Sequence, residues 1–179
     1  SLDLTPKDLD RIVVAEGPGS YTGLRIAVAT AKTLAHTLNI ELVGMSSLLA
    51  LVPNQQEGLV VPLMDARRNN VYAGFYEHAQ PVFPEAHLSF AEVLEKVKDA
   101  DQVTFVGEVG AFVEQIQKQL PQANYLETLP NAANLALWAW DKKADSLHDF
   151  VPNYLKRVEA EENWLKNHTE SGESYIKRL

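Results

Sequence analysis

The 179-residue chain is long enough for one medium-sized domain or for two small lobes with a buried core. Its net charge of −8 argues against strong nucleic-acid binding by the chain alone, because contacts with phosphates supply most of that affinity. The lack of cysteine excludes disulfides and cysteine-based zinc sites, and no apolar stretch reaches the about 20 residues of a membrane span. We expect a cytoplasmic protein that makes no membrane contact.

The start of the chain predicts a short polar helix and then a buried strand. Thr5, Pro6 and Asp8 are the residue types of a helix N-cap, a first helical position and an acidic third position. An apolar run follows at residues 11–15. Because a helix and not a central strand comes first, the pattern is typical of the middle of a βα-type domain, and we expect an N-terminal piece to be missing. A cloned or processed start is compatible with the same pattern.

Residues 16–25 predict a glycine-rich turn between this strand and a long helix. Glycine allows a sharp turn and the close approach of another group, and the following helix N-terminus offers N–H groups to an anion. The Walker and dinucleotide motifs are both absent, because no lysine follows the last glycine and the glycine spacing is one residue too long. The turn is thus a candidate anion or nucleotide loop, and a purely structural turn is the alternative. The candidate residues are Gly17, Gly19, Ser20, Tyr21, Thr22, Gly23 and Arg25.

The helix predicted over residues 22–38 has an apolar face that should pack on a sheet. A second face carries small, semi-polar residues where a solvent-exposed face usually carries Glu, Lys and Gln. This composition predicts a second helix packed against that face, and an ordinary exposed face of weak helix formers is the alternative. The residues of this candidate partner interface are Ile26, Thr30, Thr33 and Thr37.

Strands and helices alternate along the rest of the chain, which predicts an α/β layer architecture. A strand at 40–44 and a helix at 48–52 precede a polar, turn-rich stretch, 53–58, which we predict to separate two lobes. The first lobe would comprise residues 1–56, with a C-terminal helix in 159–179 as a further part, and the second lobe residues 57–158. The second lobe should contain a hairpin (59–65 and 71–76), a loop with Pro81 and Pro84, helices at 90–98, 108–120 and 131–143, and strands at 102–106 and 124–126.

Asp65 ends a predicted strand and is followed by Arg67 and Arg68. A carboxylate at a strand end can hold magnesium or act as a base. The adjacent arginines are equally good partners for it, and no second carboxylate is evident, so we favour a structural ion pair. H-E-x-x-H and G-x-S-x-G motifs are absent and no histidine has an evident relation to Ser20, which argues against a metallo- or serine peptidase.

Three motifs together resemble the TsaB (YeaZ) family of bacterial tRNA threonylcarbamoyladenosine biosynthesis proteins. They are GPGSYTGLR at 17–25, DARRNNVY at 65–72 and PNYLKR at 152–157. The resemblance extends to about Trp164. The sequence departs from the family at Ala27, where glycine is usual, at Asn69–Asn70, where Gly-Glu is usual, and in the absence of the family's first strands before Ser1.

The resemblance implies an actin-like ATPase (ASKHA, ribonuclease H-like) α/β fold of two lobes, with the first lobe incomplete. It also implies a non-catalytic subunit that supports a catalytic paralogue, TsaD, together with the ATPase TsaE, or that forms a homodimer. The chain itself would need no cofactor or metal, ATP and magnesium would act at the level of the complex, and tRNA would be met only through it. The alternatives are a small-molecule phosphotransferase of the same fold and, less favoured, a glycoprotease-like peptidase.

Overall fold

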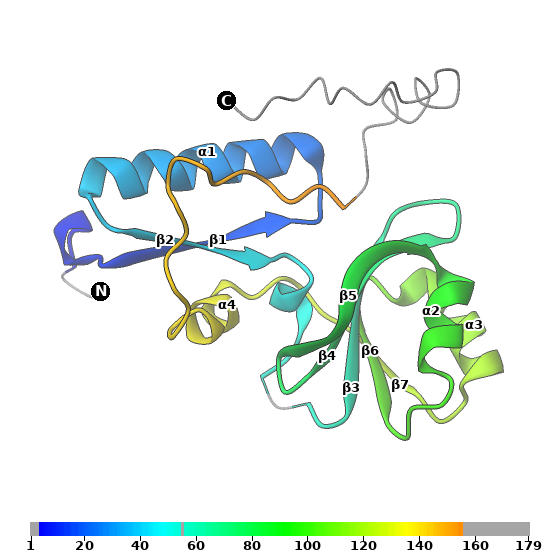
Figure 1. Ribbon diagram of the computed structural model, residues 1–179. Coiled ribbons are helices and arrows are strands. Elements are labelled where there is room, and N and C mark those ends of the chain that lie inside the picture. The colour runs from blue at the N-terminus through cyan, green and yellow to red at the C-terminus, as the bar shows by residue number, and fades with distance from the viewer. Residues whose placement is uncertain (1–3, 55, 156–179) are drawn as a thin grey trace, which may run out of the picture.

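Two β-sheets form the framework of the protein (Figure 1). The computed structural model describes residues 4–54 and 56–155. The first sheet pairs two parallel strands, β1 (Arg11–Gly17) and β2 (Glu41–Ser46), and the helix α1 (Tyr21–Leu38) connects them. Leu24, Val28, Ala31 and Ala35 are the buried residues of α1, and this face packs on the sheet. The predicted strand–turn–helix unit is therefore confirmed.

The second sheet has five strands in the order β5-β4-β3-β6-β7. Its centre is the predicted hairpin, in which β3 and β4 pair antiparallel. Strand β5 pairs antiparallel with the other edge of β4. On the opposite side, β6 pairs parallel with β3, and β7 pairs parallel with β6. The strands are β3 (Leu59–Asp65), β4 (Asn70–Glu77), β5 (Gln80–Ser89), β6 (Val103–Gly107) and β7 (Asn124–Glu127). This mixed sheet confirms the α/β class, whereas the division into lobes at 53–58 stays a prediction.

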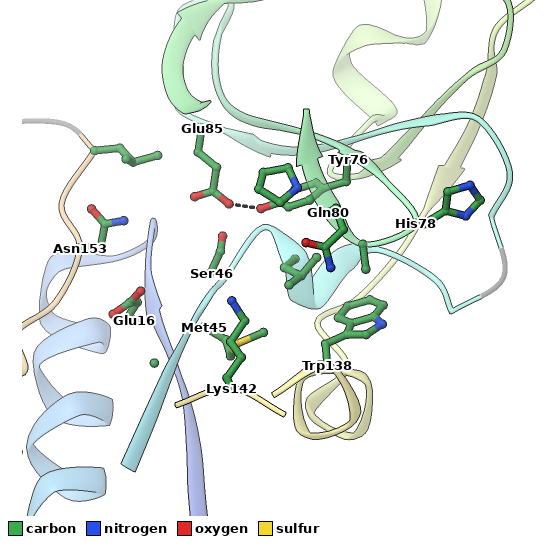
Figure 2. Close-up of a pocket in the computed structure, with 15 residues that line it drawn as sticks. Glu16, Met45, Ser46, Tyr76, His78, Gln80, Glu85, Trp138, Lys142 and Asn153 are labelled. Carbon is green, nitrogen blue, oxygen red and sulfur yellow. Dashed lines mark hydrogen bonds between the residues drawn. The ribbon is translucent and has the colours of Figure 1, made fainter. Parts of the chain in front are cut away.

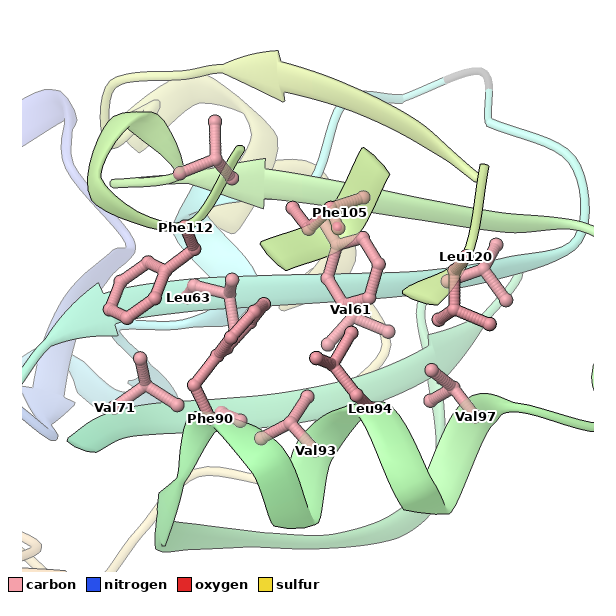
Figure 3. Close-up of a cluster of buried hydrophobic side chains, with 14 of the residues drawn as sticks. Val61, Leu63, Val71, Phe90, Val93, Leu94, Val97, Phe105, Phe112 and Leu120 are labelled. Atoms are coloured by element: carbon pink, nitrogen blue, oxygen red, sulfur yellow. The ribbon is translucent and has the colours of Figure 1, made fainter. Parts of the chain in front are cut away.

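The largest core lies between the five-stranded sheet and the helices α2 (Phe90–Val97) and α3 (Val113–Gln119) (Figure 3). Phe90 begins α2 directly after a capping box, in which Ser89 and Glu92 exchange hydrogen bonds. Its ring lies 4.5 Å from the ring of Phe112 and 6.0 Å from that of Phe105, measured between centroids. A second core joins the two sheets through β2, the short helix η2 (Leu49–Leu51) and α4 (Ala132–Trp138).

Three predicted elements were wrong. The helix expected at 48–52 is a single 3-10 turn, η2, and the loop with Pro81 and Pro84 is part of strand β5. Prolines fit there because β5 is an edge strand, where a missing N–H donor need not face a neighbour. The helix expected at 131–143 ends at Trp138, so Trp140 is 77% exposed instead of packed. The expected helix at 159–179 lies outside the described residues.

The last described segment returns to the first sheet and fixes the turn after β1. Phe150 packs against α1 and β2, and Lys32 Nζ donates hydrogen bonds to the carbonyls of His148 and Phe150. Asn153 N donates to Glu16 O. Gly17 has φ +137°, and a Cβ there would lie 2.2 Å from Asn153 O, so only glycine fits this crossing. In the described part of the chain, no helix is both long and apolar enough to cross a membrane.

Phe90→Ala tests the main core. Because Phe90 is fully buried between two other phenylalanines, its loss should lower the free energy of unfolding by about 3–5 kcal/mol in urea denaturation. Phe83→Ala is the matched control: Phe83 is 40% exposed on the edge strand and should lose clearly less. Equal losses for the two variants would contradict this description of the core.

Gly17→Ala tests the crossing. The substitution should cost about 1–3 kcal/mol for the backbone conformation alone, and more for the contact with Asn153, as measured by urea denaturation. Gly19→Ala is the control, because a Cβ there would lie 3.7 Å from the Leu24 side chain, an ordinary contact. A neutral Gly17→Ala variant would show that segment 150–153 does not hold this turn.

Candidate functional site

The glycine-rich turn places its candidate residues in two different environments. Gly19, Ser20 and Gly23 line a shallow pocket of about 240 Å³. The remaining lining residues are uncharged: Ala15, Pro18, Leu24, Ser47, Ala50, Met64 and Pro130. Ser20 Oγ accepts a hydrogen bond from Gly23 N and caps α1. Among the described residues, therefore, no charged side chain lines this pocket to neutralise an anion.

Tyr21 and Arg25 lie on the other side of the turn and contact each other. Arg25 donates a hydrogen bond to Tyr21 Oη at 2.9 Å, and its guanidinium lies 5.3 Å from the centre of the Tyr21 ring. Tyr21 also stacks on Tyr154, with 5.1 Å between ring centroids. Thr22 is exposed in the first turn of α1. The structure thus does not bring the seven residues of the turn together around one ligand position.

Asp65 lies at the end of β3 and holds the hairpin turn. Its carboxylate accepts a hydrogen bond from Arg67 N at 2.8 Å and forms an ion pair with the Arg67 guanidinium at 3.4 Å. Arg67, Arg68 and Asn69 all have positive φ, so the Asx-type bond stabilises an unusual backbone. A second carboxylate, that of Glu108, accepts a hydrogen bond from Asp65 N at 2.7 Å.

Sequence reasoning missed the proximity of Glu108 to Asp65. Glu108 directly follows β6, which pairs parallel with β3. Carboxyl ends of parallel neighbours meet at the same edge of a sheet, so this pairing was the signal that could have found it. Two carboxylates now stand where one was expected. Among the described residues, however, no group of three or more His, Asp or Glu side chains is arranged to hold a metal ion.

A larger cavity of about 470 Å³ lies between the two sheets (Figure 2). Glu16 at the end of β1 and Glu85 on β5 both line it, and Glu85 accepts a short hydrogen bond from Tyr76 Oη. Trp138 and Lys142 supply an aromatic ring and an ammonium group to its wall. No sequence pattern connects these residues, because they come from four separate parts of the chain.

Charge and burial shift two pKa values in this cavity. Burial raises the pKa of the Glu16 carboxyl, and the charges of Asp145 and Glu85 raise it further, against a smaller opposite effect of Lys142. Burial and then the charge of Glu85 raise the pKa of the Tyr76 hydroxyl, which therefore stays protonated and donates to Glu85. In the described lining of the cavity, two carboxylates thus stand against one ammonium group, that of Lys142.

The four candidate interface residues, Ile26, Thr30, Thr33 and Thr37, are all exposed on one side of α1. Ile26 is 63% exposed and the neighbouring Leu34 is 47% exposed. The hydroxyls of Thr33 and Thr37 donate to the carbonyls of Ala29 and Thr33, one turn earlier. These two hydroxyls are therefore already hydrogen-bonded within α1.

Comparisons with known proteins agree with one another. The family model described as "TsaD: tRNA N6-adenosine threonylcarbamoyltransferase" matches residues 1–164. The tRNA threonylcarbamoyladenosine biosynthesis protein TsaB of Bacillus subtilis is 38% identical over 92% of this chain and 77% of its own length. The tRNA N6-adenosine threonylcarbamoyltransferase of the same organism is 33% identical over 54% of this chain and 27% of its own length.

A solved structure from Pseudomonas aeruginosa, described as an uncharacterized protein with similarity to peptidase YEAZ, superposes with a TM-score of 0.71. It is 28% identical and covers 86% of this chain and 76% of its own. Together with the mixed five-stranded sheet, this similarity confirms the predicted actin-like (ASKHA, ribonuclease H-like) fold. The TsaB relative, together with the YeaZ-like structure, shows that the chain belongs to the TsaB (YeaZ) family.

Proposed function

We propose that this protein is a non-catalytic partner subunit in tRNA N6-threonylcarbamoyladenosine biosynthesis and that it supports a catalytic TsaD-like paralogue. The observation that carries the proposal is the exposed face of α1, on a chain whose relatives bear this pathway's name. A TsaE-like ATPase completes the assembly, ATP and magnesium act there, and tRNA meets this chain only through the complex. Such a complex works in the cytoplasm.

The outer face of α1 is suited to helix packing. Its small side chains permit a second helix to approach closely, and the hydroxyls of Thr33 and Thr37 already have partners within α1. Ile26 offers an exposed apolar side chain at the N-terminal end of the face. The inner face of α1 is already buried on the sheet, so the outer face is available to a TsaD-like chain or to a second copy.

The glycine-rich turn supports the same proposal because its polar groups have structural partners. Ser20 caps α1, Tyr21 and Arg25 contact each other, and the residues that the structure describes around the adjoining pocket are all uncharged. A serine that already caps a helix is a poor candidate nucleophile, so we do not favour a peptidase, although one structural neighbour is described as similar to one.

Thr30→Glu combined with Thr33→Glu tests the interface. Two carboxylates on this face would have to be desolvated against a partner helix, so co-purification of the natural full-length protein with the TsaD of its organism should be lost. Both residues are exposed and glutamate is a good helix former, so the fold should keep its circular dichroism spectrum and melting temperature.

Gln119→Glu combined with Gln122→Glu is the matched control. It adds the same two charges at exposed positions in and after α3, and TsaD binding should be unchanged. Size-exclusion chromatography of each variant separates loss of a heterodimer from loss of a homodimer. The proposed interface would be wrong if the variant with Thr30→Glu and Thr33→Glu bound TsaD as strongly as the unmodified protein does.

The second candidate function is a small-molecule phosphotransferase, which the proximity of Asp65 and Glu108 favours. Magnesium–ATP sites commonly use one or two carboxylates together with the substrate phosphates. Here the Asp65 carboxylate is already paired with Arg67, and the Glu108 carboxylate is bonded to Asp65 N. These bonds would have to break before a metal ion could be held, which is why we place this function second.

Calorimetry with ATP and magnesium distinguishes the two functions. As a partner subunit, the natural full-length protein alone should show no saturable binding that depends on Asp65, so Asp65→Asn should leave the titration unchanged. As a phosphotransferase, it should bind ATP and lose about tenfold or more in affinity on Asp65→Asn. ATP binding that depends on Asp65, together with turnover of a hydroxylated substrate, would favour the phosphotransferase over the partner subunit.

A further inference from the structure

The cavity between the two sheets has the size of a small-molecule site. Its volume of about 470 Å³ lies within the range of about 300–1,000 Å³ typical of ligand pockets. Its walls come from the end of β1, the edge strand β2, the β4–β5 hairpin, α4 and the segment at 153–155 (Figure 2). No residue of α1 lines it, so it is separate from the proposed interface.

Negative charge dominates this cavity. Glu16 and Glu85 line it, and Asp145, which accepts a hydrogen bond from Gly44 N, lies near enough to act on the Glu16 charge. Lys142 is the one lysine or arginine of the described lining. Among the described residues, the Glu16 carboxylate has no hydrogen-bond or ion-pair partner, although it is half-buried. A half-buried carboxylate without a partner favours the arrival of a cation.

The remaining walls suit an organic cation better than a metal ion. Trp138 and Tyr76 supply aromatic rings, and Met45 and Leu49 supply apolar surface. Aromatic faces attract ammonium groups, and apolar walls gain from burying an alkyl chain. A metal ion needs a tight set of oxygen or nitrogen ligands, and the described residues hold no such group of three.

We propose that this cavity binds a small alkylammonium compound, with its ammonium group on Glu16 and Glu85 and its alkyl chain along Met45 and Trp138. Bound in this way, the ammonium group pairs with the negative charge of Glu16, and the alkyl chain displaces water from the apolar wall. The walls belong to both sheets, so the ligand also links them.

The buried charge of Glu16 should cost stability at neutral pH. The folded state raises the Glu16 pKa above its unfolded value, so the folded protein binds this proton more tightly. The contribution of Glu16 to the free energy of unfolding is therefore fully present below the ordinary glutamate pKa. It is lost as the pH rises through the raised pKa of Glu16 in the folded state. Asp145 and Glu85 strengthen this effect and Lys142 weakens it. Glu16→Gln removes the charge, so at pH 7.5 it should raise the melting temperature of the ligand-free protein.

Isothermal titration calorimetry with butylamine, which is protonated at pH 7.5, tests the proposal. The unmodified chain should bind one equivalent, and Glu16→Gln should weaken binding about tenfold or more, because a charged pair is lost. Glu77→Gln is the matched control, since Glu77 is exposed on the same hairpin but does not line the cavity, and its binding should equal that of the unmodified chain. Lys142→Gln should strengthen binding, because it removes a competing cation.

Two further titrations and the melting temperatures decide the outcome. Butyrate, which has a similar alkyl chain but the opposite charge, and magnesium chloride should both fail to bind. Butylamine should raise the melting temperature of the unmodified chain but not that of Glu16→Gln. No saturable butylamine binding, equal binding by folded Glu16→Gln, or equally tight magnesium binding that depends on Glu16 would each overturn the proposal.

Discussion

The return of segment 150–153 to the first sheet is the contact on which much of the structure depends. Gly44 makes room for it, because a Cβ there would lie 2.4 Å from the Phe150 ring and 2.5 Å from the Glu16 carboxylate. Asn153 then bonds to the Glu16 backbone, and Lys32 of α1 holds the carbonyl of Phe150. One short segment thus joins α1, β1 and β2, and it places Glu16 at the edge of the cavity.

This contact also changes the meaning of the glycine-rich turn. Glycines that allow a ligand phosphate to approach allow equally well the approach of the chain's own backbone, and at Gly17 the approaching group is Asn153. The same segment continues to Tyr154, which stacks on Tyr21 and thereby occupies one of the groups predicted to contact an anion. In a fold shared with ATP-binding proteins, the turn here chiefly sets the start and direction of α1.

Local patterns predicted the elements that depend on neighbouring residues. The β3–β4 hairpin and the helix α1 were both predicted, since turn residues and hydrophobic periodicity act over a few positions. Strand β5 was missed because its prolines are tolerated only at an edge, and edge position is a property of the whole sheet. The Asp65–Glu108 contact depends on pairing between strands about 40 residues apart, which no local pattern contains.

The two carboxylates at the sheet ends show why a site cannot be assigned from residue type alone. For Asp65 the sequence left a metal or base role open and favoured a structural ion pair, and in the structure its carboxylate is paired with Arg67 and accepts from the N–H of the same turn. Glu16 was not singled out in the sequence, yet burial and two like charges raise the pKa of its carboxyl, against a smaller opposite effect of Lys142. A cationic ligand gains most binding free energy at a partly buried carboxylate that has no hydrogen-bond or ion-pair partner in the described structure. The cavity at Glu16 is therefore a stronger candidate binding site than the motif that resembles a phosphate loop.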